Sequence, residues 1–334
     1  ISPDLTTNDA AKIDQSTTGG LTLDITGAEN HCTILAIEPS TKQKGVIWVG
    51  TDDGNVQLTT DGGKTWTSFR GKIAGMPTGC WIPQVTASRY NAGEAFVVAN
   101  DYRRGDFKPY IFRTTDYGKT WARMVDENKV KGYTLCMIQD PTEPNLIFAG
   151  TEHGLWVSFD NGVTFQQWKN GYPSVSTFDL AIQEREADLA IATFGRALWV
   201  LDDISPLRKA ASMSGKSFTN NITVFKAPEA IQAQYRAAPG YEWSTYGLWD
   251  AENRRRGAEI SYFINKLPQR PRRDSLTTTP AAPDMAIAGG GQPTGMTGGG
   301  QGRGQGRFGG GGTGGIGSGS GDSVMVRIYN DKNE

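Results

Sequence analysis

Short apolar runs recur between residues 46 and 196, each ending in a small residue and a turn. They occupy 46–51, 95–100, 146–151 and 189–196. Runs of this length, apolar at consecutive positions, are typical of strands that are covered on both faces. One more strand is predicted before each run, at 32–38, 81–88, 133–139 and 176–183. We therefore expect a unit of successive strands that repeats four times and ends at 197–203, with no helical period of convincing length between the copies.

A turn motif follows three of the four apolar runs. The pattern Ser/Thr-x-Asp-x-Gly-x-Thr-Trp/Phe occurs at 59–66, 114–121 and 158–165. Its characteristic residues are Asp61, Gly63 and Trp66, then Asp116, Gly118 and Trp121, then Asp160, Gly162 and Phe165. The aspartate can accept hydrogen bonds from turn N–H groups, the glycine can adopt a positive φ, and the aromatic ring can fill space between strands. We predict that these residues stabilise the fold and do not catalyse a reaction.

The spacing of the motif predicts the fold. Asp61, Asp116 and Asp160 lie 55 and 44 residues apart, a period that suits propeller blades of four strands each. The chain is therefore expected to be all-β: an Asp-box β-propeller, partial, with about four blades visible. Closed propellers have about four to eight blades, so the remaining blades are expected from the same precursor or from another chain. One alternative is a processed polypeptide whose partner piece supplies them.

The pattern changes after the fourth copy, and this change suggests domain boundaries. We expect a lead-in from a preceding blade at 1–26, propeller blades at 27–205, a connecting strap at 206–256 and a partial β-sandwich at 257–334. Alternating strands at 258–264 and 323–331 are expected to pair in that sandwich. The glycine-rich segment 289–321 has too little apolar surface to fold and is read as an insertion.

Composition and charge narrow the possible partners. The 34 Lys and Arg residues balance 35 Asp and Glu, so nothing favours nucleic acid or an anionic membrane surface. No apolar stretch reaches the roughly 18 residues of a transmembrane helix, and we expect any signal peptide to lie outside this fragment. Cys32, Cys80 and Cys136 lack metal-ligand spacing and are interpreted as small buried residues, with a single disulfide left open. We predict neither cofactor nor metal.

A family resemblance rests on the repeated phrases GVIWVGTDDGNVQLTTDGGKTW, NLIFAGTEHGLWVSFDNGVTF and IATFGRALWVLDDISPLR. They resemble large bacterial secreted proteins described as WD40/YVTN/BNR-like or sortilin N-terminal-like repeat proteins, over about residues 1–208 and more loosely in the tail. The resemblance implies a signal peptide, a secreted, periplasmic or cell-surface location, and a sandwich of immunoglobulin or fibronectin type. Related propellers include peptide-binding sortilin-type receptors, xyloglucan-cleaving glycosidases and sialidases, so the activity stays open.

The candidate binding site is the enlarged turn at 100–110, which mixes aromatic, arginine and acidic residues. Such mixtures are enriched at recognition hot spots. The proposed binding residues are Tyr102, Arg103, Arg104 and Phe107, with Trp81 and Tyr90 added on the same face. Another interpretation is a loop that only packs one blade on the next. The favoured function is a non-catalytic module or scaffold that binds a protein or glycan in a secreted or cell-surface assembly.

A glycoside hydrolase is the alternative, with its site shared with the missing blades. Hydrolysis of this kind usually needs two carboxylates about 5 to 9.5 Å apart. Acids lie on many predicted turns, at Asp52, Asp53, Asp101, Asp106, Glu152, Asp202 and Asp203. Turn propensity alone also places acids there, so no catalytic residue is assigned. The two histidines, His31 and His153, are interpreted as structural.

Overall fold

The computed structural model describes residues 2–10, 31–214, 218, 220–229 and 259–265. The chain separates into two compact units, Ile1–Arg270 and Pro271–Glu334, and the second lies wholly outside the described residues. The predicted insertion at 289–321 and the predicted strand at 323–331 are in that unit. Most of the predicted lead-in and strap, at 11–30 and 230–258, also lies outside the described residues.

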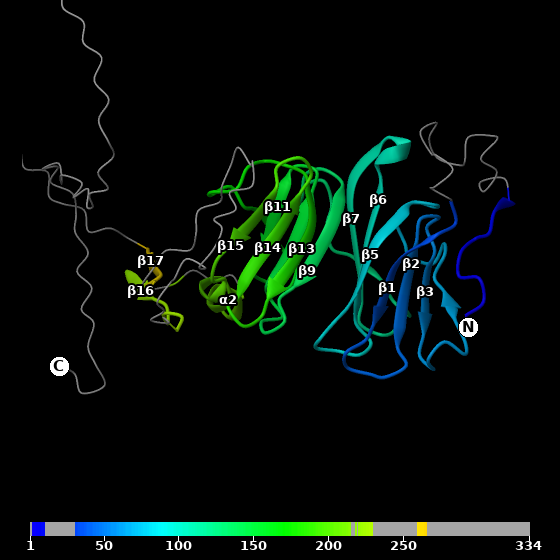
Figure 1. Cartoon of the computed structure of the whole chain (residues 1–334), viewed down its shortest axis with the longest axis horizontal. Coiled ribbons are helices and arrows are strands. Elements are labelled where there is room, and N and C mark those ends of the chain that lie inside the picture. The colour runs from blue at the N-terminus through cyan, green and yellow to red at the C-terminus, as the bar shows by residue number, and fades with distance from the viewer. Residues whose placement is uncertain (1, 11–30, 215–217, 219, 230–258, 266–334) are drawn as a thin grey trace, which may run out of the picture. The chain divides into compact units, whose positions relative to one another are not determined.

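Four antiparallel sheets follow one another along the chain (Figure 1). The first contains β1 (Ile34–Pro39), β2 (Ile47–Thr51), β3 (Val56–Thr59) and β4 (Thr67–Ser68), and the second β5 (Trp81–Ala87), β6 (Ala95–Asp101), β7 (Asp106–Thr114) and β8 (Ala122–Arg123). The third contains β9 (Thr134–Gln139), β10 (Ile147–Thr151), β11 (Gly154–Ser158) and β12 (Gln166–Gln167), and the fourth β13 (Thr177–Gln183), β14 (Asp188–Thr193) and β15 (Leu198–Leu201). Each sheet is a meander in chain order, which confirms the predicted all-β fold of propeller blades.

The second strand of each sheet carries the apolar run that marks the repeat. All seven residues of β6 and all five of β10 are buried. Trp48, Val97 and Phe112 belong to a core between the first and second sheets, whereas Phe96 and Ile147 belong to a core between the second and third. In a strand covered on both faces, every side chain is buried, which explains why apolar and polar residues do not alternate along its sequence.

The three turn motifs share one hydrogen-bond pattern, shown here for Asp116. The hydroxyl of Thr114 donates to Asp116 Oδ1 at 2.9 Å and accepts the N–H of Gly118 at 2.8 Å. Thr120 donates its N–H to Oδ1 at 2.9 Å and its hydroxyl to Oδ2 at 2.7 Å. The motifs of Asp61 and Asp160 have the same four hydrogen bonds, with Ser158 in place of threonine in the Asp160 motif. Because the N–H and hydroxyl groups stabilise the ionised carboxylate, they lower the pKa of Asp116.

In the second and third copies of the motif, the glycine and aromatic positions face the preceding sheet. Gly118 has φ +80°, and a Cβ built there would overlap the ring of Phe69. Trp121 meets the same ring edge-on at a centroid distance of 5.6 Å, and Trp48 at 6.0 Å. Gly162 likewise lies against the Met124 side chain. In the second and third sheets, the motif therefore joins the hairpin turn to the sheet before it.

Residues 2–10 cover part of the first sheet. Leu5 is buried, and its carbonyl accepts hydrogen bonds from the side-chain amides of Asn55 and Gln57 at 2.7 and 3.0 Å. The N–H of Thr7 donates to Asp53 Oδ2 at 2.6 Å. These polar contacts hold the start of the chain on the sheet.

A helix, α2 (Ser205–Ser212), follows the fourth sheet, where only a strap without a clear period was predicted. Pro206 lies in its first turn, where the missing N–H costs nothing. Eight residues are too few for a helical period to be recognised. Its Ala211 joins the core between the third and fourth sheets.

Of the strand predicted at 258–264, only Tyr262–Ile264 form a strand in the described residues; this is β17, which pairs with β16 (Ile222–Val224). Its expected partner at 323–331 lies outside the described residues.

Candidate functional site

The turn between β6 and β7 is a short rigid element. After Asp101 the chain makes a single 3-10 turn, Tyr102–Arg104, and Gly105 reverses it with φ +83°, a conformation that glycine adopts without steric cost. Arg104 donates to the carboxylate of Asp101 at 2.6 Å and to the carbonyl of Thr78 at 2.8 Å. Arg104 thus holds the turn to its own strand and to the loop before β5, so its role is to position its neighbours.

The other predicted residues of this turn come together with one that the sequence did not single out. The Arg103 guanidinium lies 3.7 Å from the ring centroid of Trp81 and 4.8 Å from that of Tyr102. Tyr102 stacks on Tyr133 at 4.3 Å, and Phe107 lies 6.2 Å from the same ring. Phe107 is 56% exposed. We call Trp81, Tyr102, Arg103, Phe107 and Tyr133 the aromatic–arginine cluster.

Tyr133 lies directly before β9 of the third sheet, and its contact with Glu152 brings the β10–β11 turn beside the cluster. Its carbonyl accepts the N–H of Glu152 at 3.1 Å. Burial raises the pKa of Tyr133, and the negative charge of Glu152 acts in the same direction, while Arg103 opposes both. One sequence signal could have identified this residue. Tyr133 and Trp81 occupy nearly equivalent places in successive repeats, because Tyr133 immediately precedes the first strand of the third sheet and Trp81 begins the first strand of the second.

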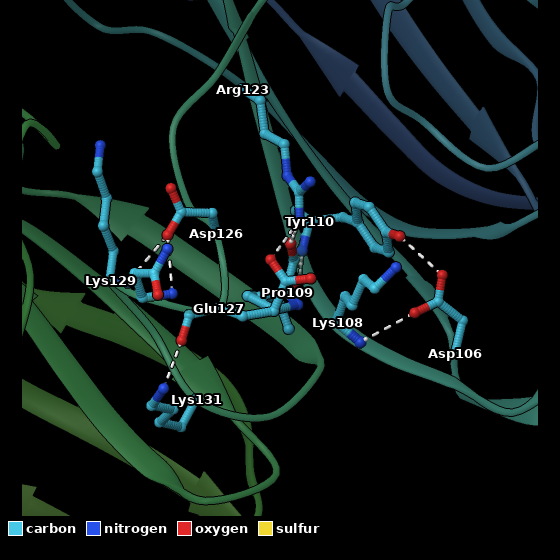
Figure 2. A network of polar contacts seen from close by, with 11 residues as sticks. Asp106, Lys108, Pro109, Tyr110, Arg123, Asp126, Glu127, Lys129 and Lys131 are labelled. Atoms are coloured by element: carbon cyan, nitrogen blue, oxygen red, sulfur yellow. Dashed lines mark hydrogen bonds and ion pairs between the residues drawn. The ribbon is translucent and has the colours of Figure 1, made fainter.

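A polar network fixes the start of β7 next to Phe107 (Figure 2). Asp106 accepts the hydroxyl of Tyr110 at 2.7 Å and the N–H of Lys108 at 3.2 Å. Arg123 of β8 lies over the Tyr110 ring at 4.5 Å and donates to the carbonyl of Pro109 at 2.8 Å. Burial and the hydrogen bond to Asp106 raise the pKa of Tyr110. Because its pKa is raised, the Tyr110 hydroxyl stays protonated near neutral pH and keeps its hydrogen bond to Asp106. The network therefore holds in place the strand that contains Phe107.

Tyr90 is not part of the cluster, which corrects the prediction that Trp81 and Tyr90 share a face. Trp81 pairs with Asn100 at one end of β5, and Ala87 pairs with Ala95 at the other. Tyr90 lies in the loop beyond Ala87, and its hydroxyl donates to the carbonyl of Asp140 at 2.7 Å. Since a strand rises about 3.3 Å per residue, the seven residues of β5 hold the two rings far apart.

The predicted turn acids make local contacts. Asp52 accepts the N–H of Thr33 at 2.7 Å and lies 3.7 Å from His31 Nδ1, and both side chains are buried. Burial raises the pKa of Asp52, although Thr33 and His31 oppose the shift. For Asp53, burial is outweighed by hydrogen bonds from Thr51 and Thr7, which lower its pKa. These contacts tie residues 2–10 and 31–33 to the β2–β3 turn.

The described residues hold no group of three or more His, Cys, Asp and Glu side chains suited to a metal ion. The three cysteines are free thiols; Cys80 and Cys136 are buried and Cys32 is partly exposed. Within the described part of the chain, no helix is long and apolar enough to cross a membrane.

Comparison with known proteins gives one curated relative in sequence. No protein-family model matches the chain. A stretch of 113 residues is 33% identical to the oligoxyloglucan-reducing end-specific xyloglucanase of Emericella nidulans. The match covers 32% of this chain and 13% of that enzyme, so the chain spans about 13% of the length of this relative.

Solved structures show more distant similarity. The GH74 xyloglucanase from Xanthomonas campestris is 13% identical with a TM-score of 0.40, over 54% of this chain and 31% of that one. YCF48 from Cyanidioschyzon merolae is 19% identical with a TM-score of 0.36, over 51% of this chain and 55% of that one. Similarities this distant carry no argument about activity or ligand.

Proposed function

We propose that this chain is a non-catalytic binding module whose ligand, a glycan or a protein, contacts the aromatic–arginine cluster. The observation that carries the proposal is the arrangement of Arg103 between the rings of Trp81 and Tyr102, beside the exposed ring of Phe107. Aromatic and arginine side chains dominate binding energy where they are held rigid. Here the turn is fixed by Arg104 and the strand by Asp106, so little side-chain entropy is lost on binding.

The test is a binding screen of the full chain against a glycan array and a peptide library. We expect Phe107→Ala and Arg103→Ala each to weaken binding at least about tenfold without lowering the melting temperature. Val163→Ala is the matched control, because Val163 is also an exposed apolar side chain but lies in the third turn motif. The proposal would be refuted if every ligand found in the screen bound the parent chain and both cluster variants with the same affinity; a ligand that depends on the cluster supports it whatever else binds elsewhere.

A glycoside hydrolase is the second candidate, favoured by the 33% identity to a xyloglucanase over 113 residues. Its site would be shared with blades outside this chain, and Asp52 and Asp202 would be the acids to test. Turnover of xyloglucan by the longer protein, abolished by Asp52→Asn or Asp202→Asn, would establish it over the binding module.

We also propose that a further blade, from the same precursor or from another chain, packs on the outer face of the fourth sheet. Ala190 and Ala192 of β14 pair with Val200 and Leu198 of β15, and the latter two are exposed. The Phe178 and Phe194 rings, also exposed, lie 5.9 Å apart on the neighbouring strand ends. An apolar face of this kind is normally covered by another layer.

This blade contact has its own test. Leu198→Ser with Val200→Ser should lower the melting temperature of a longer protein that carries the adjoining blades, and should leave this chain alone unaffected. An equal effect on both would argue against the contact.

The resemblance to bacterial secreted repeat proteins of BNR or sortilin N-terminal-like type supports a further proposal, a secreted, periplasmic or cell-surface location. Fractionation of the source cells, with an antibody against this chain, tests it. Recovery from the cytoplasm alone would count against secretion.

A further inference from the structure

A cavity of about 210 Å³ lies at the end of the sheets opposite the aromatic–arginine cluster. All four sheets contribute to its wall, because the first strand of each sheet ends there. Glu38 comes from β1, Arg89 and Tyr90 follow β5, Gln139 ends β9, and Ile182 and Glu184 come from the end of β13. Of these residues, only Tyr90 was singled out from the sequence.

The charged groups of the cavity include donors and acceptors. Arg89 Nη1 lies 2.5 Å from Glu184 Oε1, and both side chains are about half exposed, so the pair is in contact with water. Glu38 is partly buried. Burial raises the pKa of Glu38, while a hydrogen bond from the Ala87 N–H and the charge of Arg89 oppose the rise. The cavity thus offers one guanidinium and two carboxyl groups within a small volume.

Hydrogen bonds to neighbouring loops hold the remaining wall in place. The Tyr90 hydroxyl donates to the carbonyl of Asp140 at 2.7 Å, which fixes the ring while part of it stays exposed. Gln139 donates to the carbonyl of Pro144 at 3.0 Å and accepts the hydroxyl of Ser88 at 3.2 Å. Ile138 and Ile182 supply apolar surface. The cavity is therefore preformed, with an apolar side and a charged side.

We propose that this cavity binds one polyhydroxylated ring, a single sugar unit of a glycan. Its volume is below the roughly 300–1,000 Å³ of sites that hold drug-sized ligands, so one ring fits. Hydroxyl groups donate and accept, and they can pair with Arg89 as well as with Glu38 and Glu184. A cationic ligand would meet the Arg89 guanidinium, and an anionic one would meet two carboxyl groups. The C–H face of a sugar suits the Tyr90 ring and Ile182.

This site is independent of the aromatic–arginine cluster, and the experiment keeps the two apart. Xylose, glucose, galactose and a xyloglucan oligosaccharide are titrated into the full chain, with saturation-transfer NMR and calorimetry as readouts. We expect at least one of them to bind, and Arg89→Ala or Glu38→Gln to weaken that binding at least about tenfold. Arg185→Ala, which changes an exposed arginine outside the cavity wall, and Phe107→Ala should leave this binding unchanged.

Two results would overturn the proposal. One is that no sugar binds at up to about 10 mM, a concentration at which even millimolar affinity is detected. The other is that the amides of lysine or arginine bind in a Glu38-dependent manner while no sugar does, which would assign the cavity to a cationic peptide side chain. Because Arg89→Ala also removes the ion pair, Glu38→Gln with an unchanged melting temperature separates lost binding from lost folding.

Discussion

Arg208 of helix α2 donates from Nε to Oδ2 of Asp140 at 2.8 Å, across 68 residues of sequence. The Asp140 side chain is fully buried, and its other oxygen accepts the N–H groups of Thr142 and Glu143. The pair attaches the helix to the loop that follows β9.

Loss of this pair should destabilise the chain. Arg208→Ala leaves a buried carboxylate without its cation, which costs about 3 kcal/mol of unfolding free energy. Denaturant unfolding measures it, and Lys209→Ala, an exposed change in the same helix, should cost less than about 0.5 kcal/mol. Equal effects of the two substitutions would show that the pair contributes nothing.

Two glycines of the turn motif should respond differently to alanine. Gly63 and Gly118 both have positive φ, but a Cβ at Gly63 would make only ordinary van der Waals contact with Trp66 at 3.8 Å, whereas one at Gly118 overlaps Phe69. Gly63→Ala should cost about 1 kcal/mol of unfolding free energy from backbone strain, and Gly118→Ala about 2–4 kcal/mol from strain and overpacking together. Thermal and urea unfolding measure the difference. The opposite order would mean that the turns do not pack on the preceding sheet as described.

The turn aspartates should make stability depend on acid pH. Burial acts to raise the pKa of Asp160, but the hydroxyl and N–H of Thr164 outweigh it, so the net shift is downward. A lowered pKa in the folded state stabilises the fold above about pH 4, and this contribution is lost as the pH falls through the folded pKa. Asp160→Asn should therefore lower the melting temperature at pH 7 more than at pH 2. A difference that stays constant over that range would exclude the charge as its cause.

The three thiols should differ in reactivity. Burial raises the pKa of Cys80 to about 12, and it also raises the pKa of Cys136, so neither forms the reactive thiolate near neutral pH. Cys32 is partly exposed. Iodoacetamide at pH 8, followed by peptide mass mapping, should label Cys32 in the folded chain and label Cys80 and Cys136 only after denaturation. Early labelling of Cys136 would indicate that the core between the third and fourth sheets opens readily.

The repeating strands could be predicted because each sheet has a local signal. The predicted strands at 81–88 and 176–183 correspond to β5 (Trp81–Ala87) and β13 (Thr177–Gln183), and continuous apolar runs mark the second strands. Helix α2 gave no such signal because it is short.

The candidate cluster was predictable only in part, for a physical reason. Tyr102, Arg103 and Phe107 lie on one turn, so composition alone groups them. Tyr133 contacts Tyr102 only because the second and third sheets pack together. Tyr90 is not in the cluster because the length of β5 separates it from Trp81. The Arg89–Glu184 pair joins the second sheet to the fourth across 95 residues of sequence. A contact between residues so far apart leaves no periodic pattern in the sequence from which it could be predicted.

The outer faces of the first and fourth sheets differ in what covers them within the described residues. On the first, the carbonyl of Leu5 accepts hydrogen bonds from the side-chain amides of Asn55 and Gln57. A further layer added there would have to pack on residues 2–10 or displace them. On the fourth, Leu198 and Val200 are exposed beside alanines. The proposed further blade would therefore meet exposed apolar side chains on the fourth sheet, whereas residues 2–10 of this chain already cover part of the first.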